Sequence, residues 1–336
     1  MITATYQVTA PRQVAVRFHE ISHVDRVWVR PTYMSICQAD QRYYQGRRPK
    51  DILDRKFPMA LIHEAVGVVV RDDSGQFALG TPVAMLPNIP GPHVEGVYEN
   101  YAEGFTFLSS GADGFMREIV DLPASQVVRI PEASLVTSQT EMTSVACHGL
   151  RRWDAIAGER RARVGIWGDG SVGYILAAAL RAKYPDIELI VVGGHSGKLD
   201  YFSMADATYV SGGLPADLHV DHAFECVGGE GSGAAIREIV DVISPQGAVV
   251  LMGVSENPQG IATRTVLEKG LTLVGSSRSE RTDFEAAAEL WENRGFRSRI
   301  RRIVYEADPV RDVDGIHRVF MEDLGITFKT AFRWDV

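Results

Sequence analysis

The feature that most constrains the fold is a glycine-rich turn between a strand-like stretch and a helix-like stretch. Residues 163–167 have the composition of a buried strand. Gly168, Gly170 and Gly173 follow at once, before an Ala- and Leu-rich run over 174–183. In this context the first glycine permits a tight turn, the second lets the backbone approach a pyrophosphate, and the third lets helix and strand pack closely. The pattern predicts a dinucleotide-binding unit; the alternative is a glycine-rich turn without a ligand.

Strand-like and helix-like stretches continue to alternate after this turn. The pattern predicts a helix over 232–243 and further strands over 187–192, 220–226, 248–252 and 271–274. Strands that alternate with helices form a parallel, doubly wound sheet. We therefore expect an α/β fold with a Rossmann domain over 139–276.

The two ends of the chain follow a different pattern. Short apolar stretches indicate a mostly β region at the start of the chain, and they are 14–18, 24–29, 65–70 and 82–85. Residues 87–114 are rich in Pro, Gly and Asn and show no clear period, so we expect an irregular excursion there. A last strand is expected near 329–334. We expect a second domain formed by 1–138 together with 277–336.

Charge and hydropathy disfavour several classes of partner. The 336 residues include 35 Lys and Arg against 43 Asp and Glu, a net charge of −8. A domain that binds a nucleic-acid backbone normally has a basic excess, so we expect no nucleic-acid partner. No apolar run approaches the ~18–20 residues of a membrane helix, and the first residues lack the layout of a signal peptide. We therefore expect no membrane association and a cytoplasmic location.

Residues beside the glycine-rich turn indicate which dinucleotide binds. Ser171 and Val172 lie at the N-terminal end of the expected helix, where free N–H groups can face phosphates. The second strand ends without the Asp or Glu that commonly binds the ribose 2′-hydroxyl of NAD. His195, Ser196 and Lys198 supply hydrogen-bond donors and positive charge instead, which suit a 2′-phosphate. We expect NADP(H); the alternative is that these residues form a solvated loop.

A second set of residues has the chemistry of a metal site. The three cysteines are scattered and form neither a disulfide framework nor a four-cysteine zinc site. Cys37, the pair His63-Glu64, and Glu141 are nevertheless all of types that bind Zn²⁺ in mixed sulfur, nitrogen and oxygen sites. From these residues alone, a buried His beside a Glu also fits a hydrogen-bonded core pair, so both interpretations stay open.

The order of motifs resembles the zinc-containing medium-chain dehydrogenase/reductase superfamily. In chain order these motifs are Cys37-x-x-Asp40, His63-Glu64 with Gly67, the glycine-rich turn, and the strand-like residues 221–228. The resemblance implies a GroES-like, mostly β catalytic domain beside the Rossmann domain. It also implies one catalytic Zn²⁺, held by Cys37, by His63, and by Glu64 or Glu141.

Two features depart from the superfamily pattern. The four-cysteine lobe that holds a structural zinc is missing, and residues 87–114 stand in its place. Ala39 occupies a position where alcohol dehydrogenases often have a Ser or Thr that relays a proton. The remaining proton routes are a water, Tyr43, or the Glu64 and Glu141 pair.

A narrower resemblance is to the ribulose-5-phosphate reductases. It is carried by the stretches 37–46, 58–64, 99–101, 113–116, 165–170, 223–229 and 267–279. The resemblance implies NADPH-dependent reduction of D-ribulose 5-phosphate to D-ribitol 5-phosphate, with zinc polarising the C2 carbonyl. The product would supply CDP-ribitol for cell-surface polymers such as teichoic acid or capsule, which makes a cytidylyltransferase an expected partner. A homodimer is expected by analogy with the superfamily.

The resemblance to polyol dehydrogenases also aligns Tyr43 with a tyrosine that lies beside their substrate. A sugar-phosphate substrate, in addition, needs cationic side chains. We expect Arg42 and Arg278 to bind the phosphate, because a guanidinium pairs with phosphate in bidentate fashion. Arg47 and Arg48 are expected as solvated surface charges. One alternative is another NADP-dependent zinc polyol or alcohol dehydrogenase with an unphosphorylated substrate. The other is a non-catalytic nucleotide-binding protein on the same fold.

Overall fold

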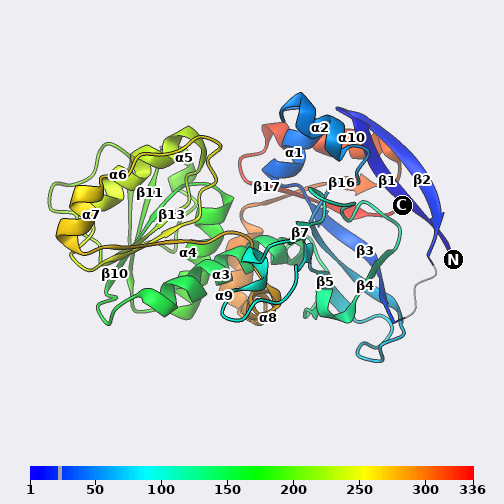
Figure 1. The fold of residues 1–336 in the computed structure, drawn as a ribbon, viewed down its shortest axis with the longest axis horizontal. Coiled ribbons are helices and arrows are strands. Elements are labelled where there is room, and N and C mark those ends of the chain that lie inside the picture. Colours follow the sequence, from blue (N-terminus) through cyan, green and yellow to red (C-terminus); the bar gives the residue numbers. More distant parts are fainter. Residues whose placement is uncertain (22–24) are drawn as a thin grey trace. The chain divides into compact units, whose positions relative to one another are not determined.

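The computed structural model describes residues 1–21 and 25–336, so Val24 of the predicted stretch 24–29 lies outside the described residues. The chain divides into two compact units (Figure 1). The ranges that form unit 1 are Met1–Ser144, Ser279–Arg297 and Ile303–Val336. Unit 2 is formed by Val145–Arg278 and Ser298–Arg302.

Unit 2 is built on a six-stranded parallel sheet with the strand order β12-β11-β10-β13-β14-β15. Its strands are β10 (Arg163–Trp167), β11 (Glu188–Gly193), β12 (Ala207–Val210), β13 (His222–Glu225), β14 (Ala248–Leu251) and β15 (Thr272–Gly275). The first strand lies in the middle, and the chain winds outward from it in both directions. This is the doubly wound order of a Rossmann fold, which places a ligand crevice at the carboxyl ends of β10 and β13. The α/β prediction with a Rossmann sheet is confirmed.

The helices of unit 2 accompany a sheet whose four central strands are almost entirely buried. They are α4 (Ser171–Lys183), α5 (Ser196–Leu199), α6 (Ser232–Val242) and α7 (Thr263–Lys269), with the short 3₁₀ turn η4 (Gly229–Gly231). All residues of α4 from Gly173 to Leu180 are buried, which explains why its sequence is apolar on every face. Strand β12 was not predicted, because its alternating half-exposed pattern at the sheet edge lacks the apolar run of the central strands.

Unit 1 is a mostly β unit, as predicted. Its main sheet has the order β16-β17-β3-β4-β5-β9, with β8 beside β3. The strands are β3 (Val27–Ser35), β4 (Glu64–Asp72), β5 (Pro82–Met85), β8 (Val120–Leu122), β9 (Val127–Arg129), β16 (Val304–Val310) and β17 (Lys329–Trp334). Strand β17 pairs antiparallel with β3, so that Ala331 lies opposite Ser35. The two ends of the chain therefore share one sheet and one apolar core.

Smaller elements complete unit 1. They are the hairpin β1 (Ile2–Ala10) and β2 (Gln13–Glu20), the pair β6 (Asn88–Ile89) and β7 (Thr106–Phe107), the helices α1 (Gln38–Tyr44), α2 (Lys50–Lys56), α8 (Arg281–Leu290) and α10 (Val313–Glu322), and the 3₁₀ turns η1 (Glu99–Tyr101), η2 (Ala124–Gln126), η3 (Thr137–Gln139) and η5 (Asp323–Gly325). Two more helices, α3 (Thr140–Ile156) and α9 (Arg294–Arg301), have residues in both units. Among the described residues, no helix combines the length and apolar character needed to span a membrane.

Two glycines of the glycine-rich turn differ in the space around them. A Cβ on Gly173 would lie 2.0 Å from the carbonyl oxygen of Gly168, whereas a Cβ on Gly170 would have no atom of the described residues within 4 Å. The backbone of Gly170 is also extended, with φ −87°. Gly173 is therefore needed for packing, whereas Gly170 has no packing role in the protein itself.

We predict that Gly173→Ala lowers the free energy of unfolding by about 3 kcal/mol, since backbone must move to admit the methyl group. Gly170→Ala, the matched control, should change it by no more than about 0.5 kcal/mol. Urea denaturation followed by tryptophan fluorescence measures both values. Equal losses in the two variants would contradict this assignment.

Candidate active site

Strand register brings three potential metal ligands together in unit 1. Glu64 is the first residue of β4, and it lies opposite Ser35 of the antiparallel neighbour β3. Cys37 follows β3 and occupies the N-cap position of α1, while His63 immediately precedes β4. Residues 26 positions apart in sequence thus meet at one end of a strand pair.

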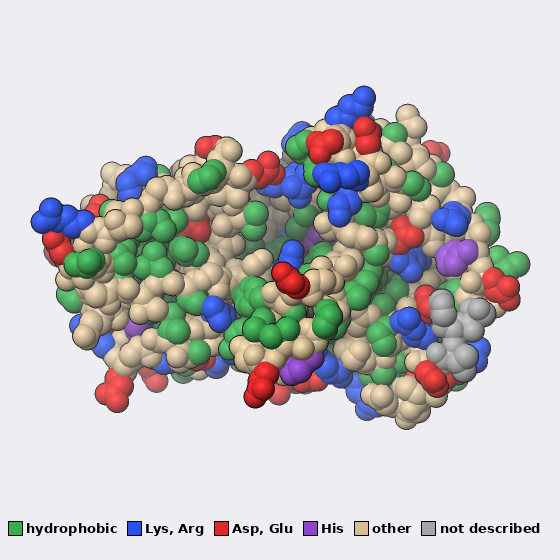
Figure 2. Space-filling model, in the orientation of Figure 1, with side chains coloured by type: hydrophobic (Ala, Val, Ile, Leu, Met, Phe, Trp, Pro, Cys, Tyr) green, Lys and Arg blue, Asp and Glu red, His purple; other side chains and the backbone are tan. Residues whose placement is uncertain are grey.

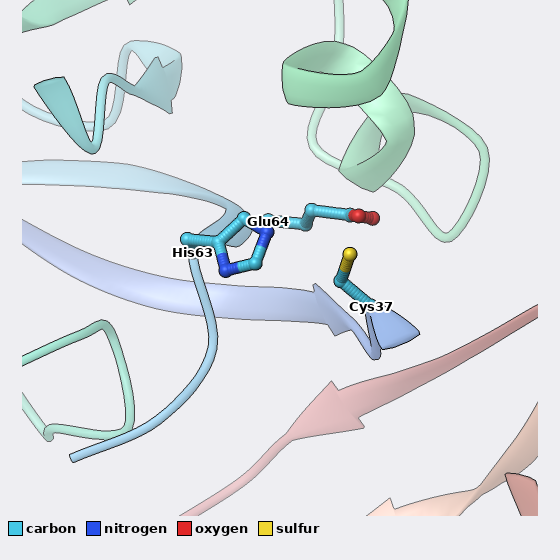
Figure 3. A group of neighbouring side chains, drawn as sticks. All are labelled: Cys37, His63 and Glu64. Carbon is cyan, nitrogen blue, oxygen red and sulfur yellow. The ribbon is translucent and has the colours of Figure 1, made fainter. Parts of the chain in front are cut away.

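The ligand atoms of Cys37, His63 and Glu64 all lie within 4.8 Å of one another. Figure 3 shows the Glu64 carboxylate lying over the Cys37 sulfur, with the His63 ring beside both. His63 and Glu64 are buried, and Cys37 is half-buried. A thiolate, an imidazole and a carboxylate are the donor set of a catalytic zinc site that keeps a position open for substrate. The residues present fit a zinc ion.

Asp40, which the sequence analysis used only as a motif marker, organises this cluster. Its Oδ2 accepts a hydrogen bond from the Cys37 backbone N–H at 3.2 Å, and its Oδ1 accepts one from the Ile62 N–H at 3.0 Å. Ile62 has φ +68°, a rare and strained conformation for a β-branched residue. Asp40 therefore fixes the backbone just before His63 and at Cys37.

The buried Asp40 and His63 shift each other's pKa. Burial alone raises the pKa of Asp40, but the charge of His63 and the hydrogen bonds of the cluster bring it below its usual value. Burial lowers the pKa of His63, but the charge of Asp40 and the hydrogen bonds to Asp40 and Cys37 raise it well above its usual value. For both groups, the neighbouring charge and the hydrogen bonds together outweigh the effect of burial on the pKa.

Lys329 is a component of the site that the sequence analysis missed. Its Nζ donates to Glu64 Oε1 at 2.7 Å and to the Ile36 carbonyl oxygen at 2.8 Å. Glu64 Oε2 also lies 2.7 Å from Nζ but outside hydrogen-bonding geometry, which leaves this buried oxygen available to a metal. Burial lowers the pKa of Lys329, but the charges of Glu64 and Cys37 raise it above its usual value. No local motif marks Lys329, because β17 reaches the cluster only through its pairing with β3.

Glu141, a predicted metal ligand, is buried in the first turn of α3. Burial raises the pKa of Glu141 to about 7; His63 opposes this shift and Glu64 adds to it. The charges of the cluster thus affect the pKa of Glu141. It is not part of the group whose ligand atoms lie within 4.8 Å of one another, and its role as a ligand stays a prediction.

Tyr43 and Arg48 lie together on the α1 side of unit 1. The Tyr43 hydroxyl is 3.4 Å from Ser110 Oγ, and the Arg48 guanidinium lies 5.2 Å from the centre of the Tyr43 ring. Arg42 and Arg48 are half-buried, whereas Arg47 is exposed. Arg48 therefore differs from the solvated charge expected for it. Figure 2 shows Lys and Arg side chains over α1 and α2, mixed with Asp and Glu.

The predicted dinucleotide site lies in unit 2, at the carboxyl end of β10. Gly168 has φ +137°, and a Cβ there would lie 2.7 Å from the Cys226 carbonyl carbon, so only glycine fits. Gly170 is the N-cap of α4, and Ser171 and Val172 are its first residues. Their N–H groups have no partner within the helix and are oriented for a phosphate.

The carboxylate of Asp169, which belongs to the glycine-rich turn, lies at the end of β11, where the sequence analysis expected no Asp or Glu. Asp169 Oδ2 accepts a hydrogen bond from the His195 backbone N–H at 2.7 Å and lies 3.0 Å from His195 Nδ1. The His195 side chain is otherwise exposed, as is Ser196, and Lys198 is half-exposed. The sequence analysis missed this carboxylate because Asp169 is distant from β11 in the chain.

Arg278, the second residue predicted to bind substrate, is exposed in unit 2 just after β15 and has φ +62°. Cys37, His63, Glu64 and Arg42 belong to unit 1. The role of Arg278 therefore stays a prediction.

Comparisons with known proteins identify the family. Residues 23–132 match the alcohol dehydrogenase GroES-like domain, and residues 172–293 match the zinc-binding dehydrogenase family. The chain is 45% identical over 340 residues to the ribulose-5-phosphate reductase of Streptococcus pneumoniae, an alignment covering 100% of this chain and 98% of that protein. It is 42% identical over 341 residues to the ribulose-5-phosphate reductase of Bacillus spizizenii, with 100% of both chains covered.

A solved structure agrees with these sequence relationships. The crystal structure of S. aureus TarJ in complex with NADPH matches 99% of both chains with a TM-score of 0.88 at 39% identity. The full-length identity and the shared fold lead to one conclusion: the chain belongs to the ribulose-5-phosphate reductases within the zinc-binding dehydrogenase family.

Proposed function

We propose that this protein reduces D-ribulose 5-phosphate to D-ribitol 5-phosphate, with NADPH as the reductant and one zinc ion at the catalytic site. The observation that carries the proposal is the clustering of Cys37, His63 and Glu64 in a full-length relative of ribulose-5-phosphate reductases. The glycine-rich turn of unit 2 supports dinucleotide binding. His195, Ser196 and Lys198 support the choice of NADPH.

Each residue in and around the cluster has a separate proposed role in the reaction. Cys37, His63 and Glu64 hold the metal, with Glu141 as the proposed further ligand. When bound, zinc supplies Lewis-acid polarisation of the C2 carbonyl, and NADPH supplies the hydride. Lys329 balances the negative charge of Glu64 at 2.7 Å. Ala39 has no hydroxyl, so the proton for the substrate oxygen comes from Tyr43 or from a water held by a Glu64 or Glu141 carboxylate.

The wider setting of the enzyme is part of the same proposal. D-ribitol 5-phosphate would pass to a cytidylyltransferase and supply CDP-ribitol for cell-surface polymers. The proposed cofactor and substrate are intracellular metabolites, which favours a cytoplasmic location. A homodimer is proposed by analogy with the superfamily. Its support in unit 2 is that β15 is the last strand of its sheet and that Leu267 (80%) and Val254 (69%) have exposed apolar side chains.

The central test is NADPH oxidation by the zinc-loaded protein with D-ribulose 5-phosphate. We expect turnover that requires the 5-phosphate and falls after chelator treatment, whereas D-ribulose alone gives little activity. Cys37→Ala should lose at least about 10³-fold in kcat/KM, because several kcal/mol of carbonyl polarisation disappear. NADPH binding, measured by fluorescence titration, should persist in this variant. Activity near that of the parent in Cys37→Ala would refute the zinc mechanism, and equal turnover of D-ribulose would refute the substrate assignment.

Loss of a charge-assisted contact to the substrate phosphate should appear in KM. Arg42→Ala and Arg278→Ala should each raise the KM for D-ribulose 5-phosphate by about 10- to 100-fold, the equivalent of about 1.5–3 kcal/mol. The KM for NADPH should stay the same. Arg47→Ala is the matched control, because that side chain is exposed and expected to be solvated. An unchanged KM in either test variant would remove that arginine from the phosphate site.

Substitution of the residues proposed to bind the cofactor should change the selectivity between NADPH and NADH. His195→Ala and Lys198→Ala should each weaken NADPH binding by about 10-fold and leave NADH binding unchanged, because only NADPH carries the 2′-phosphate. Gly170→Ala should weaken both cofactors, because its methyl group would occupy the approach to the pyrophosphate. Isothermal titration with each cofactor measures these effects. A parallel loss of NADH affinity in His195→Ala would mean that His195 acts on the loop and not on the phosphate.

A further inference from the structure

The irregular stretch over residues 87–114 places one buried hydroxyl, that of Ser109, in contact with His63 of the candidate metal site. Ser109 is 2% exposed and has φ +62°, a left-handed conformation that disfavours a residue with a Cβ. Its backbone N–H donates to the Ala112 carbonyl oxygen at 2.8 Å, and the N–H of the preceding Leu108 donates to the Pro87 carbonyl oxygen at 2.9 Å. The loop thus holds Ser109 in a costly conformation, at the position where its side chain meets His63 and Asp40.

The direction of each hydrogen bond around Ser109 follows from a count of protons. Ser109 Oγ lies 3.0 Å from Asp40 Oδ1 and 2.8 Å from His63 Nδ1. Both Asp40 oxygens already face backbone donors, Ile62 N–H at Oδ1 and Cys37 N–H at Oδ2, so the carboxylate acts as an acceptor throughout. The single hydroxyl proton of Ser109 must therefore point to Asp40. Its oxygen can then only accept a hydrogen bond, and His63 Nδ1–H is the donor.

This arrangement selects one tautomer of the imidazole. With the proton on Nδ1, the lone pair of His63 is on Nε2. The ligand atoms of His63, Cys37 and Glu64 lie within 4.8 Å of one another. Asp40 Oδ1 is farther from Nδ1, at 3.4 Å, and is already occupied by two donors. Ser109 is thus the closer hydrogen-bond partner of Nδ1. Phe107 of the same excursion meets the His63 ring edge-on, with ring centres 5.1 Å apart, and restrains its orientation.

We propose that Ser109 is a positioning residue of the metal site: by accepting the Nδ1–H hydrogen bond, it fixes the tautomer and orientation of His63 and presents Nε2 to the metal. The inference rests on the proposed function, since it concerns the same zinc ion. It adds a residue that the Cys-x-x-Asp and His-Glu motifs do not contain. Groups that hydrogen-bond a metal-binding histidine commonly change metal affinity by 10–100-fold when removed.

Two substitutions separate the hydroxyl from the backbone strain. Ser109→Ala removes only the hydroxyl, whereas Ser109→Gly removes it and also relieves the positive φ. Both variants should bind Zn²⁺ about 10–100-fold more weakly, as measured by competition with a chromophoric chelator. In cobalt-substituted protein, both should shift the visible ligand-field bands. Thermal unfolding of the metal-free Ser109→Gly variant should occur at the parent temperature or above, which excludes general misfolding as the cause.

Gln246→Gly is the matched control, because Gln246 is an exposed residue of unit 2 with φ +63°. It should leave both the zinc affinity and the cobalt spectrum unchanged. Parent-like zinc affinity and cobalt spectrum in both Ser109 variants would overturn the proposal. Weaker metal binding in these variants would support it even if the parent protein failed to reduce D-ribulose 5-phosphate, so the two proposals fail separately.

Discussion

The site of unit 1 depends on a buried ion pair between residues that are far apart in the chain. Glu64 and Lys329 have almost no exposed side-chain surface, and their charged groups are 2.7 Å apart. Removing one partner of such a pair commonly costs about 3–5 kcal/mol, because the other charge is left buried without compensation. Lys329 reaches Glu64 because β17 pairs with β3, which in turn pairs with β4. The buried charge of Glu64 is therefore compensated by Lys329 only when both ends of the chain have joined one sheet.

Unit 2 could be predicted from sequence because its signals are local. Strand β10, the glycine-rich turn and α4 are consecutive, and the glycine pattern alone indicates a dinucleotide-binding turn. Gly173 leaves no room for a methyl group, and Gly168 has a conformation that side chains rarely adopt. Helix α4 nevertheless begins at Ser171, earlier than the predicted 174, because Gly170 already serves as its N-cap. The edge strand β12 was not predicted, because half of its side chains face solvent and it therefore lacks a continuous apolar run.

The metal cluster was only partly predictable. Cys37, His63 and Glu64 could be proposed because motif order resembles a known superfamily, and strand register then brings them together. The residues that hold them in place carry weaker signals. Ser109 lies in an irregular stretch, and Lys329 is indistinguishable in sequence from a surface lysine. Asp169 shows the same limit in unit 2, since its carboxylate meets His195 only after β10 and β11 align.

Ile62 and Ser109 share one property: each is a non-glycine residue with a positive φ, next to or in contact with His63. Each such conformation costs on the order of 1–3 kcal/mol. Glycine at position 109 would remove that cost, whereas glycine at position 62 would also delete a fully buried core side chain and leave a cavity. A laboratory selection for heat resistance alone would therefore tend to replace Ser109 and not Ile62. The gain in stability would come with the loss of the hydroxyl that contacts His63, so stability and the geometry of the candidate site conflict at position 109.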